Sequence, residues 1–224
     1  MSNNKEIVIT SAFRTAIGSF GGTLSAMPAS QLGSEVIKKC LEHSELKGKD
    51  VDTVFMGQVL QAGTGQNPAR QAAMGAGIPN ETISSTINQL CASGLTSVGY
   101  AYNSILLGEA NIAVAGGQEN MSSSPHAMML RNGVKMGTGS LEDTMLKDGL
   151  TCAFNNYHMG ITAENVAEKF QIRREEQDTF AASSQRKAME AIKANKFKDE
   201  IVPIKVKVKK DEITFDTDEY PKDG

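Results

Sequence analysis

One cysteine, set among small residues, is the part of this sequence best suited to chemistry. It lies in the run Asn88-Gln89-Leu90-Cys91-Ala92-Ser93-Gly94. The run follows a strand-like segment, residues 82–87, and precedes an apolar segment of helical character, residues 95–107. This order predicts that Cys91 lies in the first turn of a buried helix.

A thiol in that position has a physical reason to act as a nucleophile. The first backbone N–H groups of a helix have no intrahelical partner, and the positive end of the helix dipole favours a thiolate, which is the reactive form. The small residues that follow leave room for a substrate carbonyl to reach the sulfur. Cys91 is therefore a candidate for covalent catalysis. The alternative is a structural cysteine, since free cysteine often packs as a small buried hydrophobe.

Strands and helices are expected to alternate over the first 120 residues. The patterns predict strands over 6–10, 52–60, 83–87 and 112–115, and helices over 29–43, 68–75 and 95–107, the first with Ser30 as its N-cap. Such an order is typical of a layered α/β domain with a largely parallel sheet. Ligands bind outside the carboxyl ends of the strands in these sheets, and Cys91 follows one such end.

The character of the chain changes after Gly117. Residues 118–150 are rich in Met, Ser and Gly and have little periodicity, so we expect a long excursion of loops that is either functional or disordered. Its methionines could cover a ligand, cover a subunit contact, or simply fill gaps. The remaining patterns predict a short helix within 157–170 that has Thr162 as its N-cap, a helix over 174–195 and a strand over 200–209. The charged residues concentrate in this last part, which predicts a separate solvated subdomain.

Composition excludes several classes of protein. The chain has 224 residues and a net charge of −3, which gives no reason to expect a nucleic-acid partner. No apolar run approaches the roughly 18–20 residues that span a bilayer, and the N-terminus has no signal-peptide pattern, so no membrane partner is expected. Three widely spaced cysteines predict neither a disulfide framework nor a zinc site. We therefore expect a cytoplasmic protein without a metal.

Motifs of other enzyme classes are incomplete in this sequence. The glycine-rich segment at residues 63–68 lacks the Gly-Lys-Ser/Thr of a phosphate loop. The Gly116-Gly117 pair lacks the spacing of a dinucleotide-binding loop, and the G-x-S-x-G motif of serine hydrolases is absent. Cys91 therefore remains the main candidate for chemistry.

Several segments, in the same order, resemble those of thiolases. They are Arg14–Gly22, Gly57–Gln71, Asn88–Gly94, Ala115–Ser122, Tyr157–Glu164 and Glu176–Asp178. The resemblance runs along the whole chain and is closest to the biosynthetic, acetyl-CoA-using members of the family. A ketoacyl synthase shares the general fold and a cysteine at a helix tip. The Asn-Pro-Ala-Arg and His-Met-Gly segments favour a thiolase over that alternative.

The resemblance implies roles for five residues. Cys91 would take an acyl group from acyl-CoA and hold it as a thioester. His158 and Met159 would line the pocket for the acyl–pantetheine end, and Leu150 would touch the pantetheine arm. Lys222 stands where related enzymes carry a basic residue near the CoA phosphates, usually arginine. Lysine keeps the charge there but loses the guanidinium fork.

The resemblance also implies an architecture and a reaction. Residues 1–120 would form a thiolase-like layered α/β/α N-terminal domain, and residues 121–224 a loop subdomain for tetramerisation and CoA binding. The reaction would condense two acetyl-CoA molecules to acetoacetyl-CoA, or run in reverse, with no cofactor beyond the CoA thioester substrate. The protein would be a homo-oligomer, dimer or tetramer, and residues 118–150 would contribute to its assembly.

The sequence departs from the family in one respect. Thiolases are nearly twice this long, and their second half supplies a histidine in a Gly-His-Pro motif, a cysteine in a C-x-G-x-G motif and an asparagine, none of which is matched here. We therefore expect an N-terminal fragment of a thiolase, without the C-terminal domain, that is close to inactive alone. The alternatives are a non-catalytic CoA- or acyl-binding half that needs a complementary subunit, and a structural remnant with an uncovered apolar face.

Overall fold

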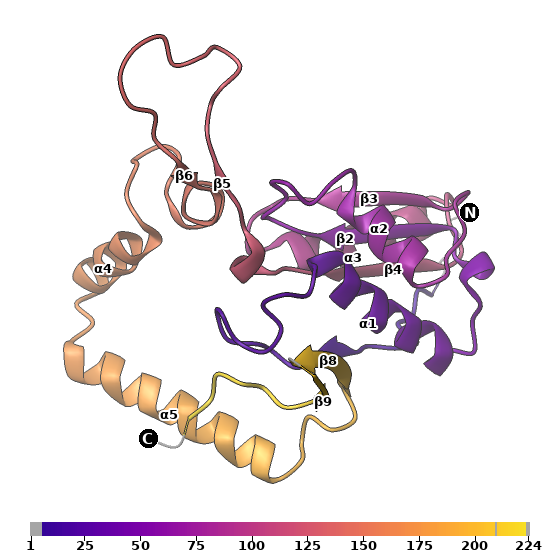
Figure 1. The fold of residues 1–224 in the computed structure, drawn as a ribbon. Coiled ribbons are helices and arrows are strands. Elements are labelled where there is room, and N and C mark those ends of the chain that lie inside the picture. Colours follow the sequence, from indigo (N-terminus) through magenta and orange to yellow (C-terminus); the bar gives the residue numbers. More distant parts are fainter. Residues whose placement is uncertain (1–5, 209, 223–224) are drawn as a thin grey trace.

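A parallel three-stranded sheet forms the centre of the N-terminal half (Figure 1). Its strands lie in the order β3-β2-β4, and they are β2 (Thr53–Gly57), β3 (Ile83–Ile87) and β4 (Ala113–Gly117). All three end at the same edge, because Gly57 of β2 is in register with Ile87 and with Gly117. The computed structural model describes residues 6–208 and 210–222.

Helices cover both faces of this sheet, which makes a mixed α/β layered fold. They are α1 (Ala29–His43), α2 (Pro68–Gly75) and α3 (Ser93–Leu106). Val54 and Met56 of β2 pack with buried residues of α1 and α2. Phe55 points to the opposite face, since side chains alternate along a strand, and its ring lies 6.0 Å from that of Tyr100 on α3.

The predicted α/β order is confirmed, and α1 and α2 begin and end where the sequence predicts. Proline at the start of α2 suits the first helical position, where no backbone N–H is needed. Asn67 caps this helix: its side-chain oxygen accepts a hydrogen bond from the Arg70 N–H at 3.2 Å. The same oxygen accepts the Thr86 hydroxyl at 2.9 Å, so the cap also ties α2 to β3.

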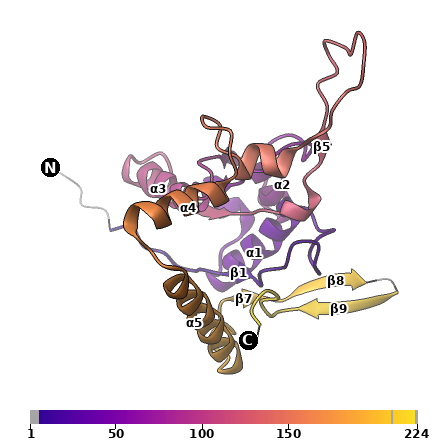
Figure 2. The same cartoon turned by 90° about the vertical axis from the view of Figure 1, so that its left-hand side faces the viewer.

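The regular elements in the rest of the described chain are short strands and turns of helix together with two longer helices (Figure 2). They are β1 (Arg14–Thr15), η1 (Gly48–Asp50), η2 (Met121–Ser123), β5 (His126–Ala127), β6 (Glu142–Asp143), η3 (Leu146–Leu150), α4 (Met159–Phe170), α5 (Arg174–Lys193), β7 (Ile201–Val202), β8 (Ile204–Val208) and β9 (Asp211–Phe215). The predicted excursion over 118–150 is indeed mostly irregular. Figure 1 shows its tip extending away from the layered unit, with α4 and α5 leading back along the chain to β8 and β9.

A second apolar cluster joins the two ends of the chain. β1 pairs in parallel with β7, and Arg14 is in register with Ile201. Beside this pair, Ala16 and Leu24 pack with Ile204 and other buried residues of both ends. The hairpin of β8 and β9 is therefore held against the N-terminal segment.

The strand predicted over residues 6–10 is wrong. No strand forms there, and Val8 and Ile9 are exposed. Thr10 and Ser11 instead contact the end of α1: the Thr10 and Ser44 hydroxyls lie 2.9 Å apart, and the Ser11 hydroxyl donates to the Cys40 carbonyl at 3.2 Å. A strand requires a neighbouring strand to take its hydrogen bonds. In this chain the neighbour comes from β7, and it pairs with Arg14–Thr15 rather than with the more apolar run.

Both predicted N-caps are also wrong. α1 begins after Pro28 with no side-chain cap, and Ser30 lies inside the helix, where its hydroxyl donates to Gln71. α4 begins three residues before Thr162, because Nδ1 of His158 accepts the Gly160 N–H at 3.0 Å and caps the helix.

The strand predicted over 200–209 is divided at Pro203 into β7 and β8. Proline has no N–H to donate to a ladder, so the two parts pair with different partners, β1 and β9. The last residue of the predicted strand, Lys209, lies outside the described residues, as do residues 1–5 and the C-terminal pair 223–224.

The start of α3 is placed by glycines at the carboxyl edge of the sheet. A Cβ atom added to Gly57 would lie 2.6 Å from the Ser93 carbonyl carbon and 2.7 Å from the Gly94 nitrogen. A Cβ atom on Gly117 would lie 3.3 Å from the Gly94 Cα. Backbone therefore packs directly on backbone where the strands meet the helix.

Substitution of Gly57 by alanine tests this packing. We expect Gly57→Ala to lower the free energy of unfolding by roughly 1–3 kcal/mol, since the added methyl group would push α3 from the sheet. Gly99→Ala is the matched control, because the space around Gly99 in α3 is open. It should raise that free energy by about 0.5–1 kcal/mol, as alanine favours a helix. Urea denaturation measures both values, and similar effects of the two substitutions would contradict the argument.

Candidate active site

Cys91 lies on a tight turn between the end of β3 and the start of α3. Leu90 before it has a left-handed backbone, with φ of 50°. The hydroxyl of Ser93 holds the turn: it accepts the Gln89 N–H at 2.8 Å and donates to the Leu90 carbonyl at 2.6 Å. Ser93 itself is buried, whereas Cys91 is exposed. The turn therefore presents the thiol outward from a buried anchor.

The predicted placement of Cys91 needs a correction. α3 begins at Ser93, so Cys91 precedes the helix by two residues, and the helix is buried along one side only. Small residues such as Ser97 and Ala101 face the sheet, where the Ser97 hydroxyl donates to the Gly116 carbonyl at 2.7 Å. Larger side chains, such as Leu95 and Tyr102, are exposed. Close packing on the glycines of β4 admits only small side chains.

A cavity of about 420 Å³ opens beside this turn. Cys91 and Gly94 lie on one side of it, and glycines at the ends of β2 and β4 form part of its wall. Met145 and Leu150 of the loop excursion close another side. The cavity is thus at the carboxyl edge of the sheet, where ligands of parallel α/β proteins bind. An exposed thiol at the edge of a largely apolar cavity can attack a thioester held there.

The structure brings two of the five predicted site residues together. Leu150 lines the same cavity as Cys91. His158 and Met159 lie at the start of α4, outside the cavity lining, and Met159 instead contributes to an apolar groove between α4 and α5. Lys222 lies near α5, where its backbone N–H donates to the Gln185 side chain at 2.9 Å. The roles of these residues stay predictions.

Glu119 also lines the cavity, although the sequence did not single it out. Its carboxylate accepts the N–H groups of Val59, at 2.8 Å, and Leu60, at 3.2 Å. Both of these residues belong to the cavity wall, so Glu119 fixes the loop after β2 to the loop after β4. The sequence signal that could have revealed it is an acidic residue two positions after the apolar strand β4.

Partial burial changes the ionisation of this carboxylate. Desolvation raises the pKa of Glu119, and hydrogen bonds from the backbone N–H groups of Val59, Leu60 and Asn120 offset only part of that effect. Two buried residues of the same cavity lining bond to each other: the Gln118 amide N–H donates to the Gln58 amide oxygen at 2.9 Å. The cavity lining thus includes a polar pair, one member of which directly precedes Glu119 in the sequence.

A second cysteine, Cys152, lies two residues beyond Leu150, and the pKa of its thiol is lowered. The Cys152 sulfur accepts two hydrogen bonds from Asn155, one from the backbone N–H and one from the side-chain amide, each at 3.4 Å. The backbone N–H groups of Asn155 and Phe154 lower the pKa of Cys152, against a smaller effect of burial. This pattern is not visible as a motif, because it depends on the turn that follows the cysteine.

The described residues contain no group of three or more His, Cys, Asp and Glu side chains placed to hold a metal ion. No helix among them is long and apolar enough to cross a membrane.

Comparison with known proteins agrees with the resemblance seen in the motifs. The chain matches the family described as "Thiolase, N-terminal domain" over residues 7–224. It is 54% identical, over 99% of its length, to an acetyl-CoA acetyltransferase of Rhizobium meliloti, and 55% identical, over 97%, to those of Chromobacterium violaceum and Shinella zoogloeoides. It covers 56%, 56% and 55% of these three proteins, so the chain spans about half the length of the curated relatives it matches.

Glu119 should leave a signature in the pH dependence of stability. A carboxyl group whose pKa is raised by folding contributes stability that is full below its unfolded pKa of about 4.3 and is lost as the pH rises through the folded pKa. We therefore expect the free energy of unfolding of the wild type, relative to Glu119→Gln, to fall as the pH rises above about 4.3. Urea denaturation at several pH values measures the difference. Glu109→Gln, which removes an exposed carboxylate, is the control, and a pH-independent difference would contradict the assignment.

Cys152 should react with iodoacetamide below the pH range of an ordinary thiol, because its lowered pKa leaves more thiolate at a given pH. Asn155→Ala removes one of the hydrogen bonds and should move the pH–rate curve of Cys152 to higher pH. Peptide-level mass spectrometry over a pH series gives that curve. An unchanged curve would show that the Asn155 side chain has no part in it, and Asn103→Ala on α3 controls for general effects.

Proposed function

The chain belongs to the thiolase family, and from that premise we propose that it is the nucleophile-bearing half of an acyltransferase. In the proposed reaction two acetyl-CoA molecules condense to acetoacetyl-CoA, or the reverse, through a thioester on Cys91. One observation carries the proposal: an exposed thiol stands at the edge of a largely apolar cavity, at the carboxyl edge of the sheet.

The first half-reaction needs little beyond this geometry. The Cys91 sulfur, as thiolate, attacks the thioester carbonyl carbon of acetyl-CoA, and a new carbon–sulfur bond forms. The bond to the CoA sulfur then breaks, and CoA leaves as a thiolate that takes a proton from solvent. The backbone N–H of Cys91 is our candidate donor to the oxyanion of the intermediate. The apolar wall formed by Met145 and Leu150 would exclude water from the thioester.

The second half-reaction requires catalytic groups in addition to Cys91. A carbanion must be made from the second acetyl-CoA, which requires a base and donors for a further oxyanion. The motifs that supply these groups in thiolases, Gly-His-Pro and C-x-G-x-G, do not occur in the 224 residues. We infer that this chain alone is close to inactive in condensation, and that the half-reaction at Cys91 is the part it can carry.

The proposed contacts to CoA involve one residue of the cavity lining, Leu150, and three residues away from it. Leu150 is assigned to the pantetheine arm, and His158 and Met159 to its acyl end. In support, the chain after Leu150 folds back on itself: Thr151 bridges His158, and the Cys152 N–H donates to the Tyr157 carbonyl at 2.9 Å. His158 is thereby tied to the neighbour of a cavity residue. Lys222 is assigned to the CoA phosphates.

Assembly and organisation form part of the same proposal. We assign residues 1–120 to an N-terminal domain and 121–224 to a loop subdomain, in a cytoplasmic homo-oligomer that needs no cofactor beyond the CoA thioester. Met129 and Met136 in the excursion are 88% and 95% exposed, which suits a subunit contact better than gap-filling.

A second candidate function has an observation of its own. The apolar side chains Leu95, Tyr102 and Leu106 lie exposed on the outer side of α3. Such a face suits a CoA- or acyl-binding half that becomes competent only with a complementary subunit covering α3. The two candidates differ in whether Cys91 reacts with acetyl-CoA in this chain alone.

Intact-mass spectrometry after incubation with acetyl-CoA separates these candidates. We expect the chain to gain one acetyl group, because the Cys91 thiolate can attack without the second half of the machinery. Cys91→Ser should gain none, and Cys152→Ser, the matched control, should behave like the wild type. No acetylation, with Cys91 still alkylated by iodoacetamide, would favour the second candidate. Formation of acetoacetyl-CoA by the purified chain would contradict the inference that it is close to inactive in condensation.

A further inference from the structure

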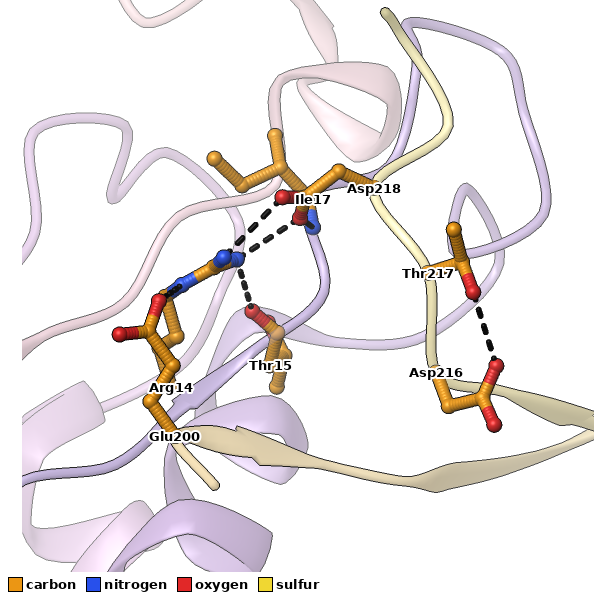
Figure 3. Close-up of polar contacts among 7 residues, drawn as sticks. All are labelled: Arg14, Thr15, Ile17, Glu200, Asp216, Thr217 and Asp218. Carbon is orange, nitrogen blue, oxygen red and sulfur yellow. Dashed lines mark hydrogen bonds and ion pairs between the residues drawn. The ribbon is translucent and has the colours of Figure 1, made fainter. Parts of the chain in front are cut away.

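Arg14 on β1 binds two acidic residues from the far end of the chain (Figure 3). Its Nη1 and Nη2 atoms donate to the two carboxylate oxygens of Asp218, at 2.7 and 3.0 Å, in a bidentate fork. Its Nε donates to Glu200 at 2.6 Å, and its guanidinium lies over the ring of Phe197. The Asp218 side chain is only 9% exposed, so this contact is better shielded than a surface ion pair.

Glu219 makes a second attachment beside the first. Its carboxylate accepts the Ser19 N–H at 2.8 Å and the Thr23 hydroxyl at 2.7 Å. Its own N–H donates to the Ile17 carbonyl at 2.9 Å. We call the set of Arg14, Glu200, Asp218 and Glu219 the Arg14 clasp.

The clasp sets where Lys222 can lie. Two residues lie between Glu219 and Lys222, and the three Cα–Cα steps that join them reach at most about 11 Å. The Lys222 backbone N–H is held in addition by the Gln185 side chain of α5, at 2.9 Å. The Lys222 side chain is therefore presented from a backbone fixed at both the N-terminal loop and α5.

The clasp also engages two acidic residues that precede Lys222 in the sequence, Asp218 and Glu219. Burial alone would raise the pKa of Asp218, but hydrogen bonds from Arg14 and the Ile17 N–H, together with the guanidinium charge, outweigh it and lower that pKa. Both Asp218 and Glu219 thus remain ionised and are engaged by other donors. In the described part of the chain, no carboxylate lies in ion-pair contact with the Lys222 ammonium, which can meet an external anion.

We propose that Arg14 is a positioning residue for phosphate recognition by Lys222. The inference rests on the proposed function, in which Lys222 meets the CoA phosphates. Arg14 acts in two ways: the fork to Asp218 fixes the segment that carries the lysine, and its charge cancels carboxylates that would repel a phosphate. Without Arg14, Asp218 and Glu200 would both lose the cation that pairs with them.

Protection of Cys91 from alkylation measures binding at the site. The probes are the S-methyl thioethers of coenzyme A and of pantetheine, which have no free thiol to consume iodoacetamide, and pantetheine lacks the phosphates. Peptide-level mass spectrometry reads Cys91 separately from Cys152. The rate without probe reports whether the turn that carries Cys91 is intact.

We expect Lys222→Gln to raise the half-protecting concentration of S-methyl coenzyme A about fivefold, the effect of losing one exposed charge contact. Arg14→Gln should raise it at least as much, and Asp218→Asn less, because Arg14 then still neutralises Glu200. S-methyl pantetheine should protect all variants equally. Arg174→Gln is the matched control, since it removes an arginine that pairs with Asp178 at the other end of α5, and it should change nothing.

Different outcomes separate the inference from the proposed function. If Lys222→Gln weakens protection but Arg14→Gln and Asp218→Asn do not, Arg14 has no positioning role and the proposed function stands. If Arg14→Gln weakens protection by both probes alike, the clasp is a structural tie alone, and the inference is wrong. If the wild type is not protected, or Lys222→Gln has no effect, the CoA contact itself is wrong. Should Arg14→Gln fail to fold, Asp218→Asn decides by the same comparison.

Discussion

Direct contact between backbones at the carboxyl edge of the sheet is the constraint on which the site depends. Gly57 leaves no room for a Cβ atom against the start of α3, and Gly117 lies nearly as close to Gly94. Because the backbone of Ser93 and Gly94 packs directly on Gly57 and Gly117, α3 begins at the edge of the sheet, and the chain turns sharply between β3 and α3. That turn carries Cys91. The small residues of the nucleophile segment therefore serve the packing as much as the access of a substrate.

The cavity beside Cys91 is built from loops that have no regular structure of their own. Such loops need ties, because each carries backbone groups that must find partners. Glu119 provides one by accepting two N–H groups from the loop after β2, and the Gln58–Gln118 pair provides another. A carboxylate costs free energy when it is partly buried, which is reflected in the raised pKa of Glu119. The wall of the cavity is held in place at that cost.

Apolar packing and a charged contact have separate tasks where the N-terminal segment meets β7 and β8. Apolar packing of β7 and β8 on the N-terminal segment brings residues 201–206 and 215 against residues 13–24, and the Arg14 clasp then fixes their alignment. The hydrophobic contact is non-directional, whereas the bidentate pair admits one geometry. Packing therefore brings these distant segments together, and the charged pair then orients them.

The sequence by itself determined the α/β order, the bounds of α1 and α2, the place of Cys91 after a strand and the family, because periodicity, proline at a helix start and ordered motifs are local signals. Only the tertiary structure decided that β1 pairs with β7, that His158 rather than Thr162 caps α4, that α3 is half exposed, and that Glu119 joins Cys91 in one cavity. Strand partners, burial and the contacts of a carboxylate are set by residues far away along the chain. A pattern read within one segment does not contain them.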